Sequence, residues 1–193
     1  MAEMNDSFNE VTAEMLKVIS DYDSVTGFQG AYNIRQDSMC AGRKNSENIT
    51  IESKTDKPGI NIRVKPGTKG ETVYIPACVT HSNVDDLVYN DFFIGEGADV
   101  TIVAGCGVHS DGSETARHNG IHRFFLEKGA KVLYKEKHIG TGKGTGLRRI
   151  DPVTDAYLKE DSYLEMDTVQ LRGVDRTTRS TSAGLEKGAK IVV

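Results

Sequence analysis

The chain has 193 residues, enough for one domain with a sizeable buried core. Its net charge of −4 and scattered basic residues argue against a nucleic-acid-binding surface, and no apolar run approaches the roughly 18 residues that cross a bilayer. The polar, acidic N-terminus is not a signal peptide, so we expect a cytoplasmic protein. Cys40, Cys78 and Cys106 are odd in number and far apart, which predicts reduced thiols.

Residues 6–22 carry a helical period. The apolar stripe follows an Asp6/Ser7 cap signal and consists of Phe8, Val11, Met15, Val18 or Ile19, and Tyr22. So short a helix is marginal alone and needs a surface to pack on. We therefore predict an N-terminal helix and linker over residues 1–28, followed by a second unit over 29–193.

From Tyr32 onward, short apolar or alternating runs are separated by turn residues, a pattern typical of an all-β domain. Three runs share one template, which is a turn glycine, a small alanine and a β-branched pair: 96–100, 128–132 and 187–191. A weaker copy begins at Glu160, and the turn positions 97, 129, 161 and 188 are 32, 32 and 27 residues apart. Such steps favour a parallel β-solenoid, in which coils stack on one another. The alternative, an immunoglobulin-like sandwich, lacks its usual tryptophan and cysteine pair.

The glycine-rich run 140–146 does not fit a phosphate-binding loop, because Lys143 is followed by glycine instead of serine or threonine. It is predicted to be a flexible loop. The chain ends in the apolar run 191–193 without a capping segment, so we expect either a longer protein or a partner that covers this end.

Metal-ligating residue types concentrate between residues 104 and 138. Cys106, His109, His118 and His122 have the spacing C-x2-H-x8-H-x3-H, which predicts a candidate metal site for zinc or iron. The alternative is that Cys106 packs as a small buried residue and the histidines are its polar neighbours.

Glu136 and His138 are expected on one face of a strand, in line with Tyr134. A neighbouring coil could bring His122 close to them, and a carboxylate beside two imidazoles could ligate iron or transfer protons. A hydrogen-bonded polar ladder is the alternative.

The sequence contains no Gly-x-Ser-x-Gly motif, which argues against a serine nucleophile. Cys78 is expected in the core and Cys40 is the expected exposed thiol, so the chain is not predicted to be an enzyme.

The sequence resembles the SufB/SufD family of iron–sulfur cluster assembly proteins, over most of the chain beyond about residue 25. The resemblance is carried by these segments: Lys57-Pro58-Gly59-Ile60, 65–69, 86–92, Ala104-Gly105-Cys106-Gly107, 120–122, Glu136-Lys137-His138 and 165–176.

This resemblance implies a right-handed parallel β-helix that acts as a scaffold for a transient iron–sulfur cluster. It implies a SufC-like ABC ATPase partner, pairing with a SufB/SufD-like chain or as a homodimer, and flavin in the full complex. Family members continue further, with a Cys-bearing coil and a His-Glu-Ala segment, so the main cluster residues are expected beyond Val193. The candidate cofactor-binding residues within this chain are Cys106, His118, His122, Glu136 and His138. A stand-alone zinc-binding or purely structural β-solenoid is the alternative.

Overall fold

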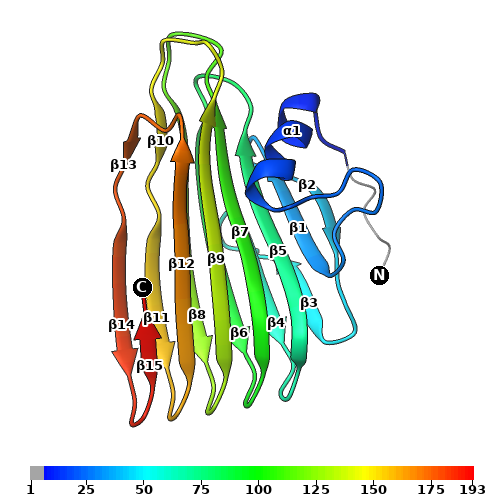
Figure 1. The fold of residues 1–193 in the computed structure, drawn as a ribbon, viewed down its shortest axis with the longest axis vertical. Coiled ribbons are helices and arrows are strands. Elements are labelled where there is room, and N and C mark those ends of the chain that lie inside the picture. The colour runs from blue at the N-terminus through cyan, green and yellow to red at the C-terminus, as the bar shows by residue number, and fades with distance from the viewer. Residues whose placement is uncertain (1–6) are drawn as a thin grey trace.

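The computed structural model describes residues 7–193, which form two facing β-sheets and one short helix (Figure 1). The first sheet contains β1 (Ala31–Gln36), β2 (Met39–Lys44), β5 (Lys69–Val79), β7 (Asp99–His109), β9 (Lys131–Thr141), β12 (Tyr163–Arg172) and β15 (Lys190–Val192). The second contains β3 (Ile49–Ser53), β4 (Gly59–Val64), β6 (Asp85–Ile94), β8 (Ala116–Leu126), β10 (Arg148–Ile150), β11 (Val153–Leu158), β13 (Arg176–Thr177) and β14 (Ser180–Leu185).

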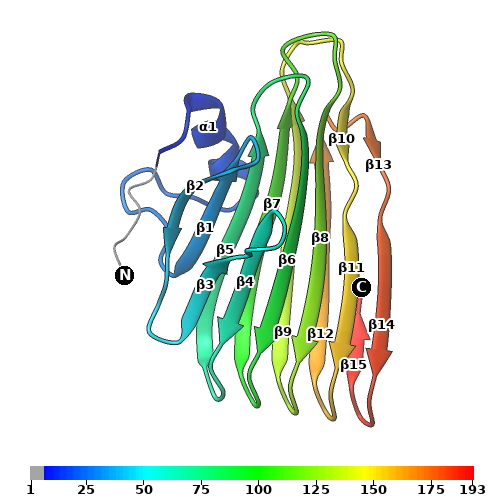
Figure 2. The ribbon, with the colours of Figure 1, turned by 180° about the vertical axis from the view of Figure 1, so that it is seen from behind.

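The chain winds between the two sheets, so each coil contributes strands to both (Figures 1 and 2). Neighbouring coils pair in parallel, with Asp99 beside Lys131 and Lys131 beside Tyr163. Among the strands of residues 7–193, β1 pairs antiparallel with β2 and β3 with β4, at the N-terminal end of the stack. The result is a β-solenoid of about four turns, and the predicted solenoid is confirmed over the sandwich. The unit boundary at residues 28 and 29 stays a prediction.

One end of the successive coils is a tight turn, and the repeat template forms the turns at 96–100, 128–132 and 187–191. Gly97 and Gly129 have φ of 64°, and Asp161 takes the same left-handed conformation at 57°. The turns stack through backbone hydrogen bonds, 2.9 Å from Gly97 N to Lys128 O and 3.0 Å from Gly129 N to Glu160 O. The alanines that follow both glycines are fully buried. The spacing read from the sequence therefore equals the coil length.

The interior near these turns is apolar and close-packed. Phe92 and Phe124 are fully buried on adjacent strands of the second sheet, and their rings stack with centroids 4.5 Å apart. Side chains of the first sheet, including Val100 and Val132, face them across the interior. On the outer face of the second sheet a separate stack joins Phe93, Phe125 and Tyr157. Alternation along each strand thus separates an inner from an outer aromatic column.

Helix α1 spans Glu10–Ile19 and is shorter than the predicted 6–22. Its N-cap is Asn9, whose side-chain oxygen accepts from Thr12 N at 2.9 Å, so the predicted Ser7 cap is wrong. Asp6 lies outside the described residues. Of the two residues predicted as alternatives in the apolar stripe, Ile19 is buried and Val18 is 39% exposed.

The helix packs on the outer face of the first sheet, where two glycines admit it (Figure 1). A Cβ at Gly105 would stand 2.6 Å from Ile19 Cβ, and one at Gly107 would stand 2.2 Å from the sulfur of Met15. The residue between the two glycines, Cys106, points the other way, into the solenoid. The Gly-Cys-Gly sequence therefore combines a flat outer surface with an inward thiol.

Replacing Gly105 with alanine is expected to lower the free energy of unfolding by about 1–3 kcal/mol, because the added methyl group displaces the helix. Gly184→Ala is the matched control, since a Cβ there meets nothing within 4 Å. Urea denaturation measures both. Equal stability of the two variants would contradict this account of helix packing.

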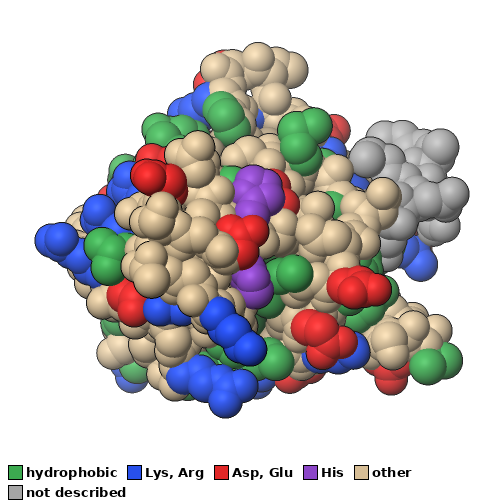
Figure 3. All heavy atoms as spheres, turned by 90° about the horizontal axis from the view of Figure 1, so that it is seen from above, with side chains coloured by type: hydrophobic (Ala, Val, Ile, Leu, Met, Phe, Trp, Pro, Cys, Tyr) green, Lys and Arg blue, Asp and Glu red, His purple; other side chains and the backbone are tan. Residues whose placement is uncertain are grey.

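The opposite end of the solenoid carries longer loops, and Figure 3 looks onto it, with histidine and acidic side chains side by side near its centre. The glycine-rich run lies here, stacked on the preceding loop: Gly144 N donates to Ser110 O at 2.8 Å and Gly146 N to Gly112 O at 2.9 Å. A Cβ at Gly146 would stand 1.9 Å from Glu114 O. The glycines therefore permit close backbone packing, a role that the prediction of a flexible loop missed.

Among residues 7–193, no helix has the length and apolarity to cross a membrane.

Candidate functional site

The half of the interior near the loops is polar. On β9 the inward side chains are Val132, Tyr134, Glu136 and His138, each no more than 2% exposed. The predicted common face of Tyr134, Glu136 and His138 is therefore present. Polar residues also line the facing strands β6 and β8, where Asp86, Asn90, His118 and His122 are buried. Buried polar groups are costly unless they have partners, so their contacts decide what this region can do.

Cys106, Glu136 and His138 form the one group of three or more metal-ligating side chains found among residues 7–193, with ligating atoms within 4.8 Å of one another. The parallel register places Cys106 of β7 directly beside His138 of β9, and Ala104 beside Glu136. The small Ala104 leaves room at the carboxylate. All three side chains are buried. We call these residues the trio.

The Glu136 carboxylate is the centre of the contacts. Tyr134 Oη donates to Oε1 at 3.0 Å, and the Arg179 guanidinium donates to Oε2. His138 Nε2 lies 3.3 Å from Oε2 without hydrogen-bond geometry, so this nitrogen has no hydrogen-bond partner. The other ring nitrogen of His138 lies 3.2 Å from Gln170 Oε1 on the next coil. Glu136 is thus held by its neighbours, whereas Nε2 of His138 approaches the carboxylate without a hydrogen bond.

The charges of the trio suit a cation. Burial alone would raise the pKa of Glu136, but His138, His122 and Arg179 hold that pKa below its ordinary value, so the carboxylate is ionised. Burial and the charge of Glu136 raise the pKa of the Cys106 thiol well above its ordinary value. The thiol is therefore protonated in the absence of a cation, and metal binding would release its proton.

The histidines of β8 face the trio from the second sheet. His118 Nδ1 lies 3.0 Å from Asp86 Oδ2, and both oxygens of Asp86 accept from Arg35. Burial would raise the pKa of Asp86, but His118 and Arg35 hold it below its ordinary value. His122 packs between Phe92 and Tyr134, with ring centroids 5.8 and 5.9 Å away.

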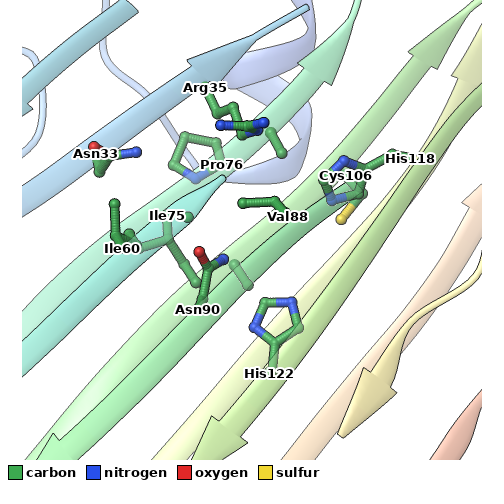
Figure 4. A pocket seen from close by; sticks show the side chains of 13 residues that line it. Asn33, Arg35, Ile60, Ile75, Pro76, Val88, Asn90, Cys106, His118 and His122 are labelled. Carbon is green, nitrogen blue, oxygen red and sulfur yellow. The ribbon is translucent and has the colours of Figure 1, made fainter. Parts of the chain in front are cut away.

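A small cavity of about 20 Å³ lies between these histidines and the first sheet (Figure 4). Cys106, His118 and His122 all line it, together with Arg35 and Asn90. Since one water needs about 10–15 Å³, this space is large enough for one water or one ion.

His109 does not join the other predicted ligands. It lies three residues beyond Cys106 and therefore on the opposite face of β7. There it lines an outer groove beside Glu10 and Val11 of helix α1. Its Nδ1 lies 2.8 Å from Thr141 Oγ1. The predicted C-x2-H-x8-H-x3-H site is therefore not assembled as a unit. Cys106, His118 and His122 come together around the cavity, and Glu136 and His138 approach Cys106 instead.

The remaining cysteines are also free. Cys78 is fully buried beneath helix α1, as expected, and burial raises the pKa of its thiol to about 12. Cys40 is half-buried, with its sulfur 3.4 Å from Asn33 Oδ1, so it is less accessible than predicted. Cys106 is the cysteine with other metal-ligating groups around it.

Thiolate, imidazole and carboxylate donors together suit iron and zinc. Sequence reasoning missed Asp86, Arg35 and Arg179, which bind the polar groups of the site. Asp86 could have been found, because it precedes His118 by 32 residues, the length of one coil.

Three curated proteins are similar to this chain, each named an iron–sulfur cluster assembly SufBD family protein. One from Archaeoglobus fulgidus is 33% identical over 98 residues, which are 50% of this chain and 26% of that protein. Two from Methanothermobacter thermautotrophicus strains are 32% and 30% identical over 89 residues. The chain is a distant homologue of SufBD family proteins.

The matched segment spans 21% to 26% of the length of these SufBD relatives. No protein-family model and no solved structure matches the chain.

Proposed function

We propose that the chain is a scaffold component of SUF-type iron–sulfur cluster assembly, and that the trio binds iron during assembly. The observation that carries the proposal is the buried group of Cys106, Glu136 and His138 in a chain homologous to SufBD proteins. Iron and sulfide are the substrates of this scaffold. The trio offers one thiolate, one carboxylate oxygen and one imidazole nitrogen to an incoming ferrous ion.

The residues around the trio suit this task. Tyr134 and Arg179 fix the carboxylate, so its remaining lone pairs point in a defined direction. Water is largely excluded, because the three side chains are no more than 5% exposed. A weakly hydrated site strengthens the attraction between Glu136 and a cation.

The proposal extends to the complex. We expect a SufC-like ABC ATPase as the partner that drives assembly, pairing with a SufB/SufD-like chain or with a second copy, flavin in the full complex, and a cytoplasmic location. The chain by itself is proposed not to be an enzyme. A pull-down from lysate of the source organism with this chain as bait, read by mass spectrometry, tests the ATPase partner, and recovery of no ABC-type ATPase would contradict it.

Anaerobic reconstitution with ferrous iron and sulfide tests the trio. The parent chain is expected to retain iron after desalting, and Cys106→Ala is expected to lose most of it. Cys78→Ala is the matched control, because Cys78 is an equally buried thiol on the opposite face of the same sheet. If Cys106→Ala retains as much iron as Cys78→Ala, the trio does not bind iron.

The second candidate is a zinc-binding β-solenoid, which the same donor set favours, since zinc accepts cysteine, histidine and carboxylate ligands. Elemental analysis of the purified protein distinguishes the two. Stoichiometric zinc that reconstitution with iron and sulfide does not displace would favour this candidate.

A further inference from the structure

His118 and His122 of β8 both line the small interior cavity (Figure 4). His118 and His122 flank Gly120, and all three residues face the interior of the solenoid. The Nε2 atoms of His122 and His118 lie 2.5 and 3.4 Å from the point at which a Cβ of Gly120 would stand. A side chain at residue 120 would clash with the His122 ring, so glycine gives the two imidazoles room beside the cavity of about 20 Å³ that they line.

His122 has no hydrogen-bond partner for either ring nitrogen, although both are buried. A buried imidazole normally has at least one partner, and the loss of a hydrogen bond at a buried polar atom costs about 1–3 kcal/mol. The side-chain oxygen of Asn90, which lies beside His122 on β6, is likewise buried without a partner.

His118 is oriented as a ligand. A carboxylate only accepts hydrogen bonds, so the Nδ1 of His118, 3.0 Å from Asp86 Oδ2, donates to it and Nε2 is the ring nitrogen left to meet a ligand. Metal-binding histidines commonly donate their second nitrogen to a carboxylate in this way. Arg35 in turn binds both oxygens of Asp86, which fixes the carboxylate behind the imidazole.

We propose that His118 and His122 bind one divalent transition-metal ion in this cavity, at a site separate from Glu136 and His138. Asn90 Oδ1 also lines this cavity and is the third donor, whereas the Cys106 thiol lines it but belongs to the trio. Two imidazoles with an amide oxygen suit zinc, ferrous iron or cobalt better than magnesium or calcium. The site goes beyond the proposed assembly function, because it requires neither sulfide nor a partner.

Anaerobic titration of the metal-free full chain with Co²⁺, read by its visible absorption and by equilibrium dialysis, tests the proposal. The parent is expected to bind an equivalent that His122→Phe loses. Phenylalanine keeps the ring packing against Phe92 and Tyr134 but removes both nitrogens. His81→Phe, at an exposed histidine in a loop, is the matched control and is expected to bind as the parent does.

A second variant addresses the cavity itself. Gly120→Ala places a methyl group against the His122 ring beside the cavity and is expected to abolish the same Co²⁺ equivalent, whereas Gly184→Ala retains it. Asp86→Asn is expected to weaken binding about 10- to 100-fold and to shift the Co²⁺ spectrum, as for a positioning residue. Thermal melts establish that each variant is folded before titration.

The outcomes separate this site from the trio. Loss of one equivalent in His122→Phe, with a further equivalent retained until Glu136→Gln is added, supports two sites. Unchanged Co²⁺ binding in both His122→Phe and Gly120→Ala overturns the inference, and a single water then partners His122. Failure of iron and sulfide to load the trio would overturn the proposed function but leave this result standing.

Discussion

Replacing Glu136 with leucine is expected to lower the free energy of unfolding by about 3–5 kcal/mol, among the largest losses for a single substitution in this chain. The carboxylate is 1% exposed and accepts hydrogen bonds from Tyr134 and Arg179. Leucine would leave the guanidinium partly buried without its anion, and the Tyr134 hydroxyl without its acceptor. The penalty comes from these unpaired partners more than from the lost attraction.

Urea denaturation at neutral pH measures the loss. Glu160→Leu is the control, because Glu160 forms an exposed ion pair of 2.8 Å with Lys128 on the preceding coil, and such pairs contribute about 0–1 kcal/mol. A second variant isolates the charge pair. Glu136→Leu combined with Arg179→Met should recover part of the stability, because neither charge remains. Parent-like stability of Glu136→Leu alone would show that the carboxylate is not held as described.

The coil length and the inward faces could be predicted from the sequence, and the polar contacts that cross between elements could not. The 32-residue step places Cys106 beside His138 and Asp86 beside His118, because parallel coils of equal length keep residues in register. Alternation then decides which residues face inward, which is why Glu136 and His138 were expected on one side. The same two rules, applied to His109, would have excluded it from the site.

Coil length and strand alternation do not predict the contacts made by residues outside the regular repeat. Arg35 belongs to an antiparallel hairpin at the start of the stack, outside the repeat. Arg179 lies where the coil step shortens to 27 residues, so the repeat does not place it over Glu136. The start of helix α1 depended on the side chain of Asn9, which the apolar period does not reveal. Tertiary packing, not local propensity, determined these features.

Replacing Phe124 with alanine is expected to lower the free energy of unfolding by about 3–5 kcal/mol, because a fully buried ring is lost and the close-packed interior cannot fill the space. Phe124 stacks on Phe92 and meets the edge of Tyr134, with centroids 4.5 and 5.3 Å away. Phe125→Ala is the matched control. It removes the same ring from the next residue of the same strand, where it stacks between Phe93 and Tyr157 on the outer face.

The outer variant is expected to cost only about 1–2 kcal/mol, since Tyr157 is 52% exposed and the outer stack remains in contact with water. Denaturant unfolding of both variants, with the parent, gives the difference. The comparison also tests register, because a shift of β8 by one residue would exchange the two faces and reverse the order of the two losses. A greater loss in Phe125→Ala than in Phe124→Ala would therefore contradict both the aromatic core and the inward orientation of His118 and His122, which lie an even number of residues from Phe124.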